Sequence, residues 1–188
     1  MRRGERDDAD GWGSAEGGDA RTARALQSLA ADGWVGARAI ARDGGEVDLL
    51  AVGPAGVFLL ASRELDGPVE LHGGVPWLER RHEPPACTSL PALRPGARDA
   101  ASRLARELAA GAAGQSLGGV RAVVVLWAQM RERLLEDEHG VLIDGRDVSE
   151  WLRAQPALLD AAALRAVVAA VELLAARRGP GAVRGARG

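Results

Sequence analysis

The chain has 188 residues, of which 47% are hydrophobic, and a formal net charge of −2 at pH 7. This length suits one domain with its own hydrophobic core, and the weak net charge excludes a general attraction to nucleic acid or anionic membranes. The single cysteine, Cys87, excludes an internal disulfide and a cysteine-rich zinc site. We expect a soluble cytoplasmic protein, because the N-terminus lacks an apolar signal region and no uninterrupted apolar run reaches the ~20 residues that cross a bilayer.

The first part of the chain predicts a disordered segment followed by a helix and a strand. Residues 1–18 are rich in Gly, Asp and Arg, so we expect them to be disordered. Asp19 is expected to cap a helix whose apolar residues recur at helical spacing, and Gly33 is expected to end it. Residues 34–41 alternate in polarity, as a strand does.

Residues 44–63 predict two strands joined by a tight turn. The first strand is expected within residues 46–52, and residues 57–60 form a continuous apolar run typical of a strand buried on both faces. Between them, residues 53–56 read Gly-Pro-Ala-Gly, which is turn composition. Acidic residues that begin one strand and polar residues that end the next would meet at one edge of the sheet. Many hydrolytic metal sites are built in this way.

The middle of the chain predicts a polar break, a hairpin and an irregular crossing. Residues 64–67 are polar, and a short hairpin is expected from residues 69–71 to residues 75–78 through His-Gly-Gly. Four prolines make residues 79–95 an irregular crossing segment.

The C-terminal part predicts a central strand, a shorter strand and three helices. Residues 120–127 form the most strand-like run of the chain, and residues 141–143 form a shorter strand. Helices are expected over residues 96–110, 147–154 and 156–178, followed by a disordered Gly- and Arg-rich tail over residues 179–188. The predicted fold class is therefore α/β, with a mixed central sheet flanked by helices.

Several of these features follow one another in the order of a known domain. They are Gly18-Asp19 at the first helix, Asp48 on a strand, the motif Gly53-Pro54-Ala55-Gly56-Val57-Phe58, Trp77 after the hairpin, Pro95 before a helix, and the apolar strand at residues 123–126. From about residue 18 to 152, the chain resembles the NERD (nuclease-related) domain of the PD-(D/E)xK nuclease-like superfamily. The resemblance implies a restriction-endonuclease-like core over residues 19–155, with residues 156–178 as an added C-terminal helix.

The chain departs from the family pattern at the positions that would carry the chemistry. The resemblance implies that Asp48 and a Glu-x-Lys pair would hold Mg²⁺ and position an attacking water. Here Ala61 and Arg63 occupy the positions of the Glu and the Lys, and Asp19 occupies the position of a helix Glu. Ala61 offers no oxygen ligand, and Arg63 stays protonated, so it can hold a phosphate but cannot act as a base.

Three hypotheses remain open. The first is a catalytically impaired NERD-like domain that needs no cofactor and retains contact with DNA or phosphate through Arg63 and Arg38. The second is an active, divergent Mg²⁺-dependent DNA endonuclease that uses Asp48 and Arg63. The third is a structural or protein-interaction domain without membrane partners, which pairs with a partner protein or forms a homodimer through its C-terminal helix.

The second hypothesis needs a substitute for the missing carboxylate. Glu46 is one candidate, because it lies two residues before Asp48 and would share its face of a strand. Glu70, expected on the next strand, and Asp19 on the first helix are the others. Trp127 is interpreted as a core residue rather than a platform that stacks a base.

Overall fold

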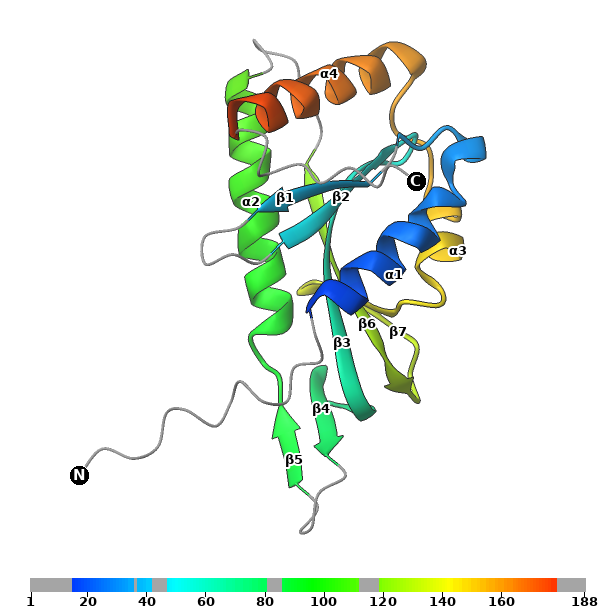
Figure 1. Cartoon of the computed structure of the whole chain (residues 1–188), viewed down its shortest axis with the longest axis vertical. Coiled ribbons are helices and arrows are strands. Elements are labelled where there is room, and N and C mark those ends of the chain that lie inside the picture. Colours follow the sequence, from blue (N-terminus) through cyan, green and yellow to red (C-terminus); the bar gives the residue numbers. More distant parts are fainter. Residues whose placement is uncertain (1–14, 36, 42–46, 81–85, 112–118, 179–188) are drawn as a thin grey trace, which may run out of the picture.

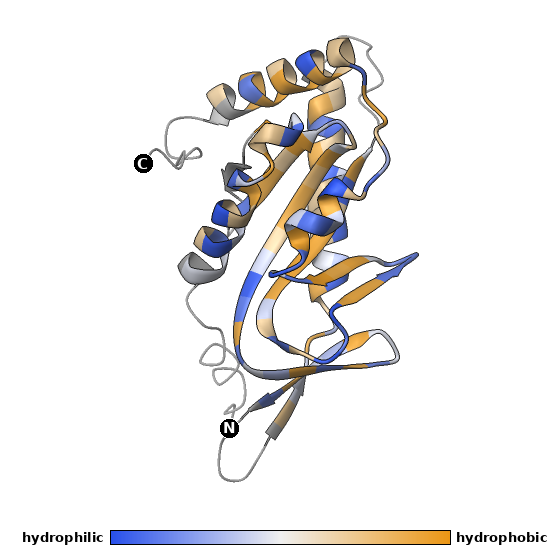
Figure 2. Cartoon of the chain, turned by 90° about the vertical axis from the view of Figure 1, so that its right-hand side faces the viewer, coloured by the Kyte–Doolittle hydropathy of each residue, from blue (hydrophilic) through white to orange (hydrophobic). Residues whose placement is uncertain are grey.

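The structure, a computed structural model, describes residues 15–35, 37–41, 47–80, 86–111 and 119–178. A mixed sheet lies between two layers of helices (Figure 1). Hydrophobic residues are concentrated in the strands between these layers (Figure 2). The predicted α/β class, with a mixed sheet flanked by helices, is confirmed.

Two helices cover each face of the sheet. Helices α2 (Leu93–Gly111) and α4 (Ala161–Arg178) pack on one face, and helices α1 (Ala15–Gln27) and α3 (Val148–Arg153) pack on the other. A short 3₁₀ helix, η1 (Ala30–Asp32), follows α1.

Eight strands are present in the described part of the chain. The main sheet has the order β1-β2-β3-β6-β8-β7, and a small arm of β4 and β5 extends from the far end of β3. β1, β2 and β3 are antiparallel neighbours, whereas β6 is parallel to both β3 and β8. The strands are β1 (Ala37–Ala41), β2 (Val47–Gly53), β3 (Gly56–His72), β4 (Val75–Arg80), β5 (Ala86–Ser89), β6 (Val120–Met130), β7 (Leu134–Asp137) and β8 (Gly140–Asp144).

β3 is the strand on which both cores are built. Its side chains alternate between the faces, so that Phe58 and Leu60 join the core under α1 and α3, while Val57 and Leu59 join the core under α2 and α4. The predicted burial on both faces is therefore confirmed. Burial of a large side chain such as Phe58 contributes about 1.5–3 kcal/mol.

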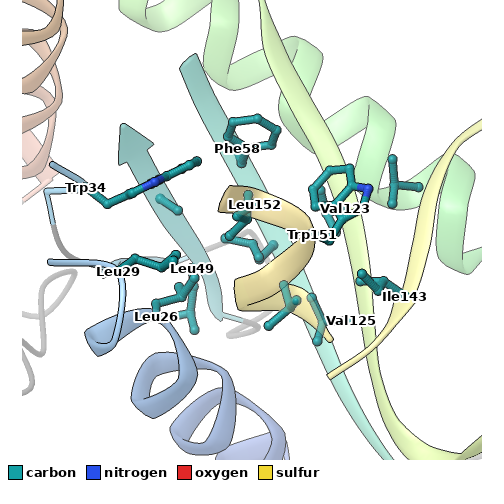
Figure 3. Packing of buried hydrophobic residues seen from close by; sticks show 14 of the residues in the cluster. Leu26, Leu29, Trp34, Leu49, Phe58, Val123, Val125, Ile143, Trp151 and Leu152 are labelled. Atoms are coloured by element: carbon teal, nitrogen blue, oxygen red, sulfur yellow. The ribbon is translucent and has the colours of Figure 1, made fainter. Parts of the chain in front are cut away.

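Aromatic rings organise the core under α1 and α3. The ring of Phe58 lies between Trp34 and Trp151, with centroid distances of 5.6 Å and 5.9 Å (Figure 3). Trp34 in turn lies against the backbone of Gly53, where an added Cβ would overlap the indole ring. The turn at the end of β2 therefore requires a residue without a side chain.

The N-terminal helix differs from its prediction. α1 begins at Ala15, so residues 15–18, which were expected to be disordered, are helical. Asp19 consequently lies inside the helix and does not cap it. The predicted end of the helical region at Gly33 is confirmed, since Gly33 adopts a φ of 80° after η1. The predicted disordered residues 1–14 and 179–188 lie outside the described residues.

Two segments expected to be irregular are strands. β3 continues through Glu64 and Asp66, where polar residues predicted a break, and β5 forms within the proline-rich crossing. Backbone pairing with β4 explains β5, because ladder hydrogen bonds do not require apolar side chains. In β3, the pairs at Glu64 and Pro68 lie on either side of residues 65–67 and keep the strand continuous. The predicted hairpin between residues 69 and 78 is confirmed as β3 turning into β4.

The last helix begins later than its proline predicted. Asp160 accepts hydrogen bonds from the backbone N–H groups of Ala162 and Ala163, at 2.9 Å and 2.8 Å, and so caps α4. Before it, the N–H groups of Leu158 and Leu159 bind the carbonyl of Pro54. None of the described helices is both long enough and apolar enough to pass through a lipid bilayer.

The same substitution at two glycines is expected to have opposite effects on stability. Gly53→Ala should lower the free energy of unfolding by about 1–3 kcal/mol, because the new methyl group overlaps Trp34. Gly96→Ala in α2 should raise it by about 0.5–1 kcal/mol, because nothing lies within 4 Å of an added Cβ and Ala favours a helix. Urea unfolding of the two variants checks both signs, and a neutral Gly53→Ala would contradict the tight packing.

Candidate functional site

Asp48 on β2 and Ala61 and Arg63 on β3 belong to the same face of the sheet. Alternation along the two strands turns them toward the layer of α2 and α4. The antiparallel β2–β3 ladder ends at the pair of Leu49 and Leu60, and Asp48 and Ala61 are the next residues along the two strands. The fold therefore gathers three positions that the sequence singled out, which we call the Asp48 site.

The Asp48 site is largely closed to solvent. Asp48 is fully buried, and Ala61 is 4% exposed and packs in an apolar cluster with Ala97 of α2 and Leu126 of β6. Arg63 is half-buried, and its Nη1 donates a hydrogen bond of 2.7 Å to the carbonyl of Ser62. Hydrocarbon thus fills the position where the family pattern would place a second carboxylate.

The proposed substitutes for that carboxylate lie elsewhere or outside the description. Glu70 was predicted to lie on the next strand, but it lies on β3 itself, nine residues after Ala61. Because a strand rises about 3.3 Å per residue, the two positions are far apart. It is exposed, and its carboxylate lies 3.5 Å from His72. Asp19 is half-buried on α1, which packs on the opposite face, and Glu46 lies outside the described residues.

No described group of three or more His, Cys, Asp or Glu side chains is arranged to hold a metal ion. Arg38, the second predicted phosphate contact, is placed only by its backbone. It pairs with Leu50 on β2, two residues from Asp48, and its side chain lies outside the described part of the structure.

The opposite face of β3 carries a buried polar network that the sequence did not predict. Ser62 Oγ and Trp127 Nε1 each donate a hydrogen bond of 2.8 Å to Thr22 Oγ1. Thr22 and Ser62 are buried, so the network satisfies polar groups that would otherwise be costly to enclose. It ties α1 to β3 and β6. The available signal was a serine two residues beyond the apolar run over residues 57–60.

Arg21 lies beside this network. Its Nη1 donates a hydrogen bond of 2.9 Å to Glu64 Oε1, and its guanidinium lies 4.5 Å from the centre of the Trp127 ring. Gly18 allows this approach, because an added Cβ would lie 3.1 Å from the backbone nitrogen of Glu64. Trp127 is partly buried and packs against the core under α1 and α3, as the sequence interpretation expected, and it also has the cation of Arg21 over its ring.

A second polar cluster centres on Asp144, which is fully buried at the end of β8. It accepts hydrogen bonds from the backbone nitrogen and Nε of Arg146, at 2.9 Å and 2.8 Å, and Arg133 Nε lies 3.6 Å away. Burial acts to raise the pKa of Asp144, but the hydrogen bonds from Arg146 and the charges of Arg146 and Arg133 outweigh it, so the pKa lies below its ordinary value.

A cavity of about 300 Å³ opens between these two clusters. Its shape follows from the strand register: Glu64 pairs with Trp127 and Pro68 with Gln129, so three residues of β3 face one residue of β6. The strands splay at this bulge. We call it the Trp127 cavity, and its polar lining consists of Arg21, Glu64, Asp66, Trp127, Gln129 and Arg146.

Comparison of the chain with protein-family models, with curated proteins and with solved structures found no match. The resemblance to the NERD domain therefore rests on the residues of the chain itself.

Asp144→Asn is expected to lower the free energy of unfolding by about 2 kcal/mol at neutral pH, because it weakens hydrogen bonds to a charged partner. The folded-state pKa is depressed, so the carboxylate's contribution is complete above its unfolded pKa of about 3.9 and is lost as the pH falls through the folded value. The difference between variant and wild type in urea unfolding should therefore shrink below about pH 4.

Asp66→Asn, at an exposed carboxylate on the same cavity, is the matched control and should change stability little. A deficit of Asp144→Asn that stays constant from neutral pH to about pH 3 would show that the ion pairs do not stabilise the fold.

Proposed function

We propose that the chain is a NERD-type, nuclease-related domain that has lost metal-dependent catalysis and retains contact with nucleic-acid phosphate. The observation that carries this proposal is the convergence of Asp48, Ala61 and Arg63 on one face of two adjacent strands. The element order supports it as well. A helix precedes the strands β2 and β3, and after a further helix comes the apolar strand β6, in the order that the resemblance implies.

Loss of catalysis follows from the ligands that Mg²⁺ requires. The ion prefers octahedral coordination by oxygen, usually with one or two carboxylates. Asp48 supplies one carboxylate, and the methyl group of Ala61 supplies none. Arg63, in the place of the Lys, keeps its proton and cannot activate water. Each of these substitutions removes a different part of the family's chemistry.

Arg63 can keep contact with phosphate because of the geometry of its guanidinium group. A guanidinium presents its N–H donors in a planar fork that matches two phosphate oxygens at once, which a lysine cannot do. Arg63 lies beyond the end of the β2–β3 ladder, and its side chain is half-buried rather than enclosed. We therefore propose that Arg63 binds a phosphate group of the nucleic acid.

Arg63→Ala is expected to weaken binding of DNA and to reduce the slope of log K against log salt by about one, because one phosphate contact is lost. Fluorescence anisotropy at several salt concentrations measures both quantities. Arg63→Lys should keep most of the slope but lose affinity, since the charge remains and the fork does not. Arg103→Ala, an exposed arginine on α2, is the control that should leave binding unchanged.

The alternative of an active endonuclease has a different signature. Mg²⁺- or Mn²⁺-dependent cleavage of plasmid DNA that disappears in Asp48→Ala would contradict the loss of catalysis. It would assign Asp48 to a working metal site, completed by a carboxylate such as Asp19 or Glu46.

A second candidate function is a homodimer formed through the C-terminal helix. Leu173 on α4 is 56% exposed, and Leu158 just before the helix is 72% exposed. Val167 and Val171 on the same helix are buried in the core, whereas Leu173 lies on the exposed side of α4 together with Arg165 and Glu172. Scattered exposed leucines are common, and the case rests on the exposure of Leu173 within α4 and of Leu158 just before it.

Leu173→Glu is expected to convert such a dimer to a monomer without unfolding it, because the side chain does not belong to the core. Sedimentation velocity measures the state of association. Deletion of α4 is unsuitable for this purpose, since it would remove the core residues Val167 and Val171 and uncover the side chains of α2 and β2 in the same core. A wild-type chain that sediments as a monomer would exclude the homodimer.

A further inference from the structure

The Trp127 cavity lies on the face of β3 opposite Arg63, so the Asp48 site does not explain it. Its volume of about 300 Å³ is at the lower end of the range of about 300–1,000 Å³ typical of small-molecule pockets. The cavity has room for one small planar group. Its lining is mainly polar, which distinguishes it from a gap in the core.

Arg21 gives the cavity a flat, positioned surface. One side of its guanidinium faces the Trp127 ring at 4.5 Å from the centroid, and Glu64 holds it through a hydrogen bond of 2.9 Å. The Arg21 side chain nevertheless remains 49% exposed. Guanidinium planes and aromatic rings are the surfaces on which proteins stack unpaired nucleic-acid bases.

The charges around the cavity favour an uncharged group over a phosphate. Arg21 is paired with Glu64, and Arg146 is paired with the buried Asp144. The one further charged side chain among the described lining residues is Asp66, which is exposed and acidic. A phosphate would therefore find no excess positive charge, whereas the N–H groups of a heterocycle would find an acceptor.

The edge of such a heterocycle would meet several hydrogen-bonding groups. The carboxylate of Asp66 accepts, and the amide of Gln129 both donates and accepts. Leu65, Asp66 and Gly67 are not paired with residues of β6, and all three line the cavity. A bulge at this point opens space beside the strand pair without breaking β3.

We propose that the Trp127 cavity binds the base of an unpaired nucleotide, stacked on the guanidinium of Arg21 and bound at its edge by Asp66 and Gln129. The ligand is either a free nucleotide or a base of single-stranded nucleic acid, since both present the same planar group. This inference extends the proposed function from the phosphate to the base, and it rests on that function for the nucleic-acid strand.

Titration with nucleosides tests the cavity without any phosphate, and hence without Arg63. Added nucleosides should shift the NMR signal of the Trp127 indole N–H, which the variant Trp127→Phe identifies. Arg21→Leu and Arg21→Lys should both abolish the shift, because both lose the guanidinium plane. Arg24→Leu, an exposed arginine on the same helix, should retain it. Absence of a shift in the wild type, or its persistence in both Arg21 variants, would overturn the base site.

A short single-stranded oligonucleotide and the same strand with abasic sites separate base from backbone. Removal of the bases should weaken binding by about fivefold to a hundredfold, and so should Arg21→Leu. Arg21→Leu should not weaken binding of the abasic strand any further, because that strand has already lost the base contact. Arg63→Ala should weaken binding of both strands equally. Nucleosides that bind while neither strand does would overturn the phosphate contact and identify a free nucleotide as the ligand. Equal affinity for the two strands would overturn the base site within nucleic acid.

Discussion

Burial of β3 on both faces is the constraint on which the rest of the structure depends. Phe58 and Leu60 face one pair of helices while Val57 and Leu59 face the other. A slip of one residue in the pairing of β3 would exchange the two sets and place each against the wrong layer. Two independent cores therefore fix one register, and every polar residue farther along the strand inherits its face from that register.

The same alternation divides the chemistry of three consecutive residues. Ser62 and Glu64 turn toward α1, where Thr22 and Arg21 receive them, while Arg63 turns toward the face of Asp48. The two candidate sites thus share a strand but not a space. A buried hydroxyl network thus stabilises one side of β3 at the level where the other side bears the guanidinium of Arg63.

The sequence predicted what short-range patterns encode. Continuous apolar runs marked the centres of β3 and β6, and the turn composition of residues 53–56 marked the connection between β2 and β3. It failed where distant contacts decide the outcome. Asp66 and its neighbours remain in a strand because Glu64 and Pro68 on either side of them pair with β6, and the hydrogen bond from Trp127 to Thr22 joins residues remote in the chain. The Trp127 cavity forms where three residues of β3 face one residue of β6, and no local sequence pattern predicts such a bulge.

The packing around the methyl group of Ala61 also limits which residues position 61 can accept. It packs against Ala97 and Leu126 beside the fully buried Asp48. A glutamate introduced there would overfill a closed space and set a second carboxylate next to the first, so steric strain and like-charge repulsion would act together. Such a variant is expected to be unstable unless α2 moves away from the sheet, because Ala97 of α2 packs in the same cluster as Ala61. The close packing of α2 on β3 therefore requires a small residue at position 61.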